Sequence, residues 1–248
     1  MSKILAIDTA LSSCSVALSD HGSVSSLREH EPRQHIRLVL PMVDDLLQQS
    51  GLSILDIDAI GFNQGPGSFT GLRIGMGVVQ GLAFGADIPV MPVSTLQSMA
   101  QAAIDQTPLS ADRLVMPLID ARMNEVYWAI YKNTDGRARS VCADALNNPE
   151  DVGRIILEQD ILKQGIPGQT ADSNIAIGVG DGWQFRDRIA VQPNEIKEQL
   201  TSDAVQVLAL AVDAYEQGLA VSVEQVEPLY LRNEVSWTKR QRLRKPSK

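Results

Sequence analysis

The alternation of apolar and polar positions predicts an α/β chain that opens with strands. Residues 3–8 and 14–19 are the first two expected strands, and a third, near 23–28, follows a glycine turn. Two alternating runs around a glycine turn are typical of a β-hairpin. Residues 35–49 then repeat apolar side chains at intervals of three and four, which predicts an amphipathic helix.

A second strand–helix unit surrounds a glycine-rich loop. Residues 55–62 are expected to form a strand, the loop follows at 63–71, and residues 70–85 are expected to form a helix. A strand at 88–93 leads into another helix, which Ser94 is placed to cap.

The second half of the chain repeats this layout at coarse resolution. Its expected elements are strands at 113–120 and 125–132, a helix at 149–163, a strand at 174–179 and an amphipathic helix at 201–217. Each half begins with a strand that ends in aspartate, at Asp8 and at Asp120. This repetition indicates a two-lobed α/β fold of the actin-like or sugar-kinase-like kind, in which such carboxylates face the cleft between the lobes.

The organisation expected from these elements is an N-terminal lobe at 1–107, a C-terminal lobe at 108–225 and an extended tail at 226–248. The polar segment 108–112 is the expected boundary between the lobes. The helix 201–217 belongs to the second half in sequence, but packing of this helix back onto the first lobe stays an open alternative.

The charge distribution argues against direct nucleic-acid binding by most of the chain. The 248 residues carry a formal net charge of −8, and residues 238–248 hold six of the 22 basic residues and no acidic residue. Without those six, the net charge is −14, and an acidic body repels phosphate backbones. The basic segment either contacts RNA or a partner, or is a solvated terminus.

The remaining composition favours a cytoplasmic globular protein. We expect no signal peptide and no membrane span, because no basic–apolar leader pattern opens the chain and no window approaches 18 uncharged apolar residues. The two isolated cysteines, Cys14 and Cys142, are typical of a reducing compartment.

The glycine-rich loop is the most distinctive motif. Gly65, Gly67 and Gly71 lie in the run GPGSFTG, directly before the expected helix. Backbone N–H groups at a helix N-terminus can hold an anion, so a phosphate cradle is one interpretation. The other is a capping turn whose glycines allow close packing. No Lys-Ser/Thr pair follows, so the loop is not a Walker A motif.

The helix after this loop carries glycine on two faces. Gly71 and Gly75 lie four residues apart, and Gly77, Gly81 and Gly85 form a second series at the same spacing. Each glycine inside a helix costs about 1 kcal/mol relative to alanine, so close approach of another backbone is expected on both faces. We expect this helix and the helix 35–49 to form a pairing surface with an apolar stripe; burial of both faces within the monomer stays open.

Neither a metal site nor a catalytic residue is predicted. His21, His30 and His35 lack the four-residue helical spacing of a two-histidine site, and Ser68 does not lie in a G-x-S-x-G motif. The candidate residues of a nucleotide cleft are Asp8, Thr9, Gly65, Gly67, Ser68, Asp120 and Gly180. Each aspartate can alternatively cap a turn.

Several runs of this sequence resemble the TsaB (YeaZ) family, over residues 3–237. They are ILAIDTA, RQHIRLVLPMVDDLL, NQGPGSFTGLRIGMGVVQGLAFG, VSTLQSMAQ, IDARMNEVYWA, GVGDGW and VEPLYLRNEVSW. The GPGSFTGLRIG run is shared with the wider family of the catalytic subunit TsaD, whereas IDARMNEVYWA and YLRNEVSW point to TsaB.

The resemblance implies an actin-like (ASKHA, ribonuclease-H-like) fold and a role in forming threonylcarbamoyl on adenosine 37 of tRNAs that read ANN codons. In that family, the TsaB-like protein pairs with a catalytic TsaD-like protein through helices that match 35–49 and 70–85, and a TsaE-like ATPase joins them. A homodimer is expected when the chain is alone, and tRNA is expected mainly through the complex. The residues assigned to this interface are His35, Leu38, Val39, Met42, Leu46, Leu72, Arg73, Gly75, Met76 and Val79.

The sequence departs from the catalytic relative at its metal site. That relative carries two metal-binding histidines one helical turn apart, where this chain has Thr95 and Met99. The resemblance therefore implies a non-catalytic partner or activator, and leaves ATP or ADP at the complex interface open. The alternative is an ATP-dependent phosphotransferase of the actin or sugar-kinase class that uses Asp8, since carboxylates suffice for Mg²⁺.

Overall fold

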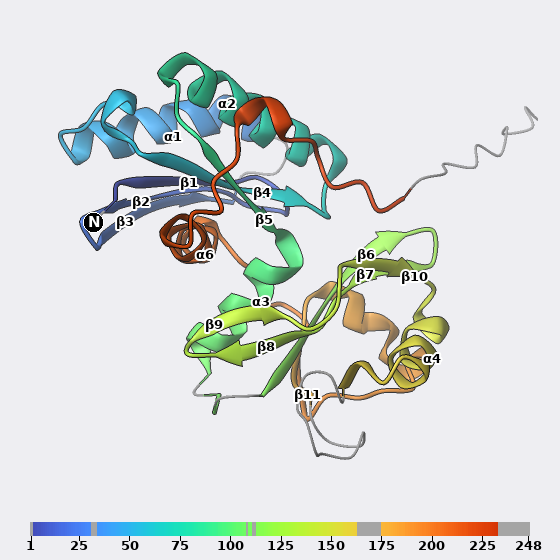
Figure 1. The fold of residues 1–248 in the computed structure, drawn as a ribbon. Coiled ribbons are helices and arrows are strands. Elements are labelled where there is room, and N and C mark those ends of the chain that lie inside the picture. Colours follow the sequence, from blue (N-terminus) through green and yellow to red (C-terminus); the bar gives the residue numbers. More distant parts are fainter. Residues whose placement is uncertain (1, 31–33, 108, 111–112, 163–174, 233–248) are drawn as a thin grey trace, which may run out of the picture.

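The computed structural model describes residues 2–30, 34–107, 109–110, 113–162 and 175–232. The basic segment 238–248 lies outside the described residues. Two β-sheets, each flanked by helices, form the two lobes of the molecule (Figure 1).

The first lobe is built on a five-stranded sheet in the order β3-β2-β1-β4-β5. Its strands are β1 (Ile4–Asp8), β2 (Cys14–Asp20), β3 (Ser23–Glu29), β4 (Ala59–Gly65) and β5 (Val90–Ser94). The strands β1, β4 and β5 run parallel, while β2 and β3 form the predicted antiparallel hairpin. The carboxyl ends of the three parallel strands therefore meet at one edge, which faces the second lobe (Figure 1).

Helices cover both faces of this sheet. The helices α1 (His35–Gln49) and α2 (Phe69–Ala86) lie on one face, over Leu5 and Ile7. The helix α6 (Ala204–Glu216) lies on the other, over Ile4 and Ala6 (Figure 1). Successive strand residues point to opposite faces, so an unbroken apolar run such as ILAI serves both layers.

The helix α6 comes close to the sheet because small residues line its contact. A Cβ on Gly61 would lie 2.5 Å from the Cβ of Ala211, and Ala6, Ala17 and Ala59 share this face. The backbone N–H of Ala204 also donates to Ser15 Oγ at 2.9 Å. The helix expected at 201–217 thus packs on the first lobe, which was the open alternative.

Two short 3₁₀ helices, η1 (Ile54–Asp56) and η3 (Val223–Gln225), lie at the rim of the first lobe.

The second lobe contains a mixed sheet in the order β10-β7-β6-β11-β12, from which β8 and β9 extend as a hairpin paired to β6. Its strands are β6 (Leu114–Arg122), β7 (Glu125–Trp128), β8 (Tyr131–Thr134), β9 (Arg137–Ser140), β10 (Ala145–Asn147), β11 (Ile175–Val179) and β12 (Glu195–Lys197). The helix α3 (Thr95–Gln106) packs on one face, and α4 (Pro149–Glu158) and the 3₁₀ helix η2 (Asp181–Arg188) pack on the other.

Two sequence expectations need correction here. The strand expected at 55–62 begins at Ala59, because residues 54–56 form the 3₁₀ helix η1 with an Asp56–Ser53 capping box. The single strand expected at 125–132 is divided into β7 and β8, which pair with different parts of β6. Alternation along the run could not show this break, because Ala129 and Ile130 at the break are both buried.

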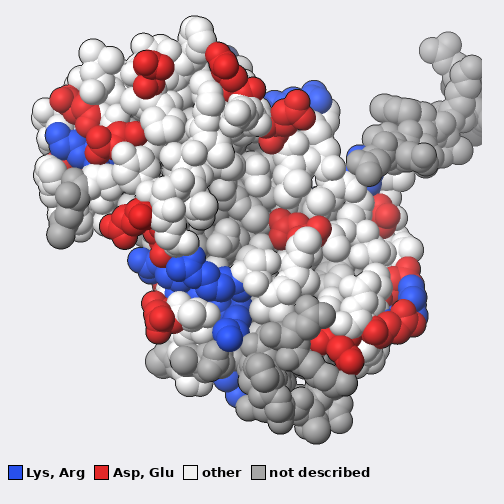
Figure 2. Space-filling view, in the orientation of Figure 1, with Lys and Arg blue, Asp and Glu red and all other residues white. Residues whose placement is uncertain are grey.

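Contacts across the lobes join the β8–β9 hairpin to α6. Arg139 donates two hydrogen bonds to the Asp213 carboxylate, at 2.6 and 2.9 Å. Figure 2 shows basic side chains gathered in this region, with acidic groups spread over the rest of the face. Among the described residues, no helix is both long and apolar enough to cross a bilayer.

Candidate functional site

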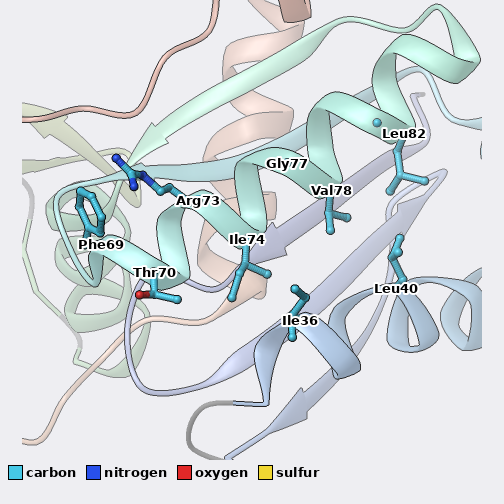
Figure 3. Close-up of a pocket in the computed structure, with 10 residues that line it drawn as sticks. Ile36, Leu40, Phe69, Thr70, Arg73, Ile74, Gly77, Val78 and Leu82 are labelled. Atoms are coloured by element: carbon cyan, nitrogen blue, oxygen red, sulfur yellow. The ribbon is translucent and has the colours of Figure 1, made fainter.

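An open apolar groove lies between α1 and α2, on the surface of the first lobe (Figure 3). Its volume is about 700 Å³. Its lining residues are Ile36, Leu40, Phe69, Thr70, Arg73, Ile74, Gly77, Val78, Gly81 and Leu82. Ile36 is 68% exposed and Phe69 is 57% exposed, so large apolar side chains face solvent here. Contiguous exposed apolar surface of this kind marks an interaction site.

The second glycine series of α2 forms the smooth side of the groove. A Cβ on Gly77, Gly81 or Gly85 would meet no described atom within 4 Å, and Gly77 and Gly81 line the groove. Within the described residues, this helix face is therefore open rather than packed. A second helix could approach its backbone closely.

The first glycine series serves the monomer itself. A Cβ on Gly71 would overlap the carbonyl oxygen of Thr9, and a Cβ on Gly75 would overlap Thr9 Oγ1. Thr9 Oγ1 donates to the carbonyl oxygen of Gly71 at 2.8 Å, which locks α2 against the end of β1. Gly71 and Gly75 are thus explained by close packing within the first lobe.

The expected interface residues require a correction. Of that set, the side chains of Val39, Met42, Leu46, Leu72, Met76 and Val79 are buried, and so are His35 and Gly75. Met42 and Leu46 were expected on the pairing surface, but in the structure they pack on the first sheet. Only Arg73 is exposed, while Leu38 is half-buried. The residues that line the groove instead lie beside this buried stripe.

The sequence contained a signal for these missed residues. The helix α1 carries Ile36 and Leu40 in addition to its buried apolar set. An apolar surplus outside one core-facing stripe indicates a second contact surface.

The cleft between the lobes is a separate cavity of about 790 Å³. Of the candidate cleft residues, Gly67, Ser68, Asp120 and Gly180 line it. They come from the glycine-rich loop, from the end of β6 and from the turn after β11. The topology thus brings together turns from both halves of the chain, as the two-lobed layout predicts.

The other candidate cleft residues are enclosed in the first lobe. Asp8 is 1% exposed, and burial raises its pKa from 3.8 to about 6, although the hydrogen bond from the backbone N–H of Ala10 partly opposes this. The Thr9 hydroxyl is hydrogen-bonded to Gly71 of α2, and Gly65 packs against the carbonyl oxygen of Leu229. These three residues do not line the cleft, because the packing of α2, α6 and the C-terminal segment covers them.

The glycine-rich loop fits the capping interpretation. Ser68 Oγ accepts the backbone N–H of Gly71 at 3.3 Å, and the backbone N–H of Ser68 donates to the carbonyl oxygen of Ala10 at 2.8 Å. These donors are therefore engaged within the protein and do not point at an anion. The cleft lining carries three carboxylates, from Asp120, Asp181 and Glu198, and two guanidinium groups, from Arg122 and Arg232, so it offers a phosphate no excess of positive charge.

Thr95 and Met99, where the resemblance placed the metal-binding histidines of the catalytic relative, are buried in α3. Thr95 is 0% exposed and Met99 is 1% exposed. The Met99 methyl group fills the space beside Gly180. In the described part of the chain, no three His, Cys, Asp or Glu side chains lie together as a metal site would require.

Two lobes around a cleft, built on strand–hairpin–helix units, define an actin-like protein. The family model for tRNA N6-adenosine threonylcarbamoyltransferase (TsaD) matches residues 28–241. The chain is 42% identical over 241 residues to "tRNA threonylcarbamoyladenosine biosynthesis protein TsaB" of Escherichia coli (96% of this chain, 97% of that protein). It is 40% identical over 236 residues to the protein of the same name from Haemophilus influenzae (95% and 96%).

Solved structures agree with these sequence relatives. YeaZ from Pseudomonas aeruginosa superposes with a TM-score of 0.81 at 40% identity, over 93% of this chain and all of that one. A second Pseudomonas aeruginosa structure, described as similar to peptidase YEAZ, gives a TM-score of 0.83 over 94% of this chain. The chain belongs to the TsaB (YeaZ) family, and its fold is the two-lobed actin-like fold.

Proposed function

We propose that this chain is the non-catalytic partner of a TsaD-like subunit in forming threonylcarbamoyl on adenosine 37 of tRNAs that read ANN codons. The observation that carries the proposal is the open α1–α2 groove, with its exposed Ile36, Leu40 and Phe69 beside the bare glycine face of α2. An apolar helix of the partner fills such a groove and covers surface that water otherwise contacts.

The same groove accounts for the other expected assemblies of this chain. When the chain is alone, the groove pairs two copies into a homodimer; with the TsaD-like subunit present, the heterodimer replaces it. A TsaE-like ATPase joins this pair, tRNA is bound mainly by the complex, and ATP or ADP is expected only where subunits meet. We expect the complex to act in the cytoplasm.

The geometry disfavours the phosphotransferase alternative. Catalysis by Asp8 needs a carboxylate that reaches the cleft, whereas Asp8 is 1% exposed and does not line it. The cleft lining holds three carboxylates against two arginines, so it has no net positive charge for a nucleotide phosphate. These observations support the proposal that the partner, rather than this chain, transfers the threonylcarbamoyl group.

Complex formation tests the proposal. The chain is mixed with its cognate TsaD-like protein and measured by light scattering, beside Gly77→Arg and Gly85→Arg. Both substitutions add an arginine to an unobstructed helical position, but only Gly77 lines the groove. We expect a one-to-one complex that Gly77→Arg abolishes and Gly85→Arg retains. Absence of a wild-type complex, or equal binding by both variants, would overturn the proposal.

Gly75→Arg is not a suitable interface probe, although Gly75 was assigned to the interface. Its side chain would overlap Thr9 inside the lobe, so loss of binding would report damage to the fold. ATP turnover by the isolated chain is the companion assay. Turnover that Asp8→Ala removes would support the phosphotransferase instead.

A further inference from the structure

A C-terminal segment crosses from the first lobe to the second. We call residues 226–232 the strap; it follows η3 and runs past the end of β4 toward the β6–β7 turn (Figure 1). Val226 is buried in the core of the first lobe, and the backbone N–H of Leu229 donates to the carbonyl oxygen of Gln64 at 2.9 Å. The strap is thus anchored to the first lobe at its start.

The middle of the strap touches the wall of the groove. Arg73 Nε donates to the Tyr230 hydroxyl at 3.0 Å, and the Arg73 guanidinium lies 3.6 Å from the centre of the Phe69 ring. The rings of Phe69 and Tyr230 are 6.0 Å apart. Phe69 lines both the groove and the cleft, so this cluster separates the two cavities.

The end of the strap holds the second lobe. The Arg232 guanidinium pairs with the Glu125 carboxylate and donates to the carbonyl oxygen of Ala121 at 3.1 Å. The turn that it holds, residues 122–124, has φ values of 63°, 55° and 64°. Three successive non-glycine residues in the left-handed region are costly, and they persist where neighbouring contacts enforce them. Arg232 supplies such contacts at the mouth of the cleft.

Arg73 has bonding capacity left at the rim of the groove, on the side of α2 that faces away from Ile36 and Leu40 (Figure 3). It is exposed and is the only charged residue among the ten that line the groove. Within the described part of the chain, its Nε is engaged by Tyr230, whereas its two terminal nitrogens make no hydrogen bond. A guanidinium fork at the rim of a groove whose other lining residues are uncharged matches a carboxylate, which it can bind through two parallel hydrogen bonds.

We propose that a carboxylate of the partner helix seated in the groove binds the terminal nitrogens of Arg73, and that the strap transmits this contact to the second lobe and closes the cleft. The proposal rests on the proposed function, because it requires a partner in the groove. The carboxylate restricts Arg73 to one rotamer, which keeps the hydrogen bond between Arg73 Nε and the Tyr230 hydroxyl. Because Arg232 follows Tyr230 by two residues, this bond also keeps Arg232 in contact with the β6–β7 turn.

Partner binding and the contacts of the strap must affect each other equally. If groove occupation stabilises the strapped state, then loss of the strap must weaken partner binding by the same factor. Binding of the partner in the groove and closure of the cleft between the lobes are therefore thermodynamically coupled. The acid on the partner is also a specificity element, since an apolar helix without it would leave the cleft unaffected.

The experiment measures the distance between the lobes by pulsed electron spin resonance. Spin labels are placed on Leu55→Cys in the first lobe and Leu157→Cys in the second, which are 74% and 49% exposed. The background is Cys142→Ser; Cys14 is buried and does not react. The test variant is Arg232→Ala. The matched control is Arg122→Ala in the same turn, whose side chain is 82% exposed and pairs with Asp120 rather than the strap. Circular dichroism confirms that each variant is folded.

We expect the TsaD-like partner to narrow the distribution of distances between the two spin labels in the parent chain and in Arg122→Ala, but not in Arg232→Ala. We also expect Arg232→Ala to bind the partner several-fold more weakly than the parent chain does. Narrowing in Arg232→Ala equal to the parent overturns the strap proposal. An unchanged distribution in a parent chain that does form the complex overturns it as well, and leaves the proposed function standing. Absence of any complex overturns both.

The carboxylate contact has its own readout. Arg73→Gln should weaken the complex at least fivefold at low salt and reduce the dependence of its affinity on salt. Arg73→Lys keeps the charge but replaces the planar fork, whose nitrogens point in fixed directions, by a single nitrogen, so it should retain part of the affinity and lose the narrowing of the distance distribution. Unchanged affinity and salt dependence in Arg73→Gln would exclude the partner carboxylate.

Discussion

Replacement of Asp8 by asparagine should stabilise the protein at neutral pH. Asp8 ends β1, is 1% exposed, and accepts the backbone N–H of Ala10 at 2.9 Å through Oδ1. Asparagine keeps the shape and this acceptor but carries no charge. If Asp8 were instead the catalytic carboxylate of a phosphotransferase, the same substitution would also remove ATP turnover.

The magnitude follows from the pKa. Burial raises the pKa of Asp8 from 3.8 to about 6, and each pH unit corresponds to about 1.4 kcal/mol, so the ionised form costs about 3 kcal/mol. Below pH 3.8 both states are protonated and the cost is absent. Between pH 4 and pH 6 the unfolded chain ionises while the folded chain retains its proton, so wild-type stability falls. Above pH 6 the difference is constant.

Urea unfolding of wild type and Asp8→Asn between pH 4 and pH 8 measures this difference. We expect similar stabilities near pH 4 and an advantage of about 3 kcal/mol for Asp8→Asn at pH 7, with a melting temperature roughly 6–12 °C higher. A variant that is less stable than wild type at pH 7, or an advantage that does not change with pH, would refute the assignment of Asp8 as a buried, charge-penalised carboxyl.

Three further substitutions test the packing of the first lobe. Gly75→Ala should lower the free energy of unfolding by about 1–3 kcal/mol, because its Cβ overlaps Thr9; a neutral effect in chemical denaturation would contradict that contact. Gly81→Ala should raise it by about 1 kcal/mol, because the new methyl group meets no described atom; a loss in the same assay would show that this face is occupied. Ser94→Ala should cost about 1–2 kcal/mol, since Ser94 Oγ caps α3 and donates to Asp144 at 2.5 Å; an unchanged melting temperature would speak against the cap.

Much of the local structure was predictable from the sequence. The helix expected at 35–49 coincides with α1 (His35–Gln49), and Ser94 is the N-cap of α3, as its position before an apolar run suggested. The strand–hairpin–helix repetition identified the two-lobed actin-like fold, and the quoted motifs identified the family. These features depend on residues close together in the chain, where periodicity and capping chemistry act directly.

The site was less predictable, because periodicity does not choose between two apolar faces of one helix. Met42 and Leu46 were expected on the pairing surface, yet they pack on the sheet, and Ile36 and Leu40 face the groove instead. Which face is buried is decided by the sheet that the helix meets.

What the sequence determined by itself is the order of the main strands and helices of the first lobe, the family, and the presence of glycines and surplus apolar residues on α1 and α2. Only the tertiary structure decided which glycines contact Thr9 and which stay open, that Asp8 is enclosed, and that Tyr230 reaches Arg73 across 157 positions of the chain. These outcomes depend on how distant segments exclude water from one another, and local sequence patterns carry no record of that.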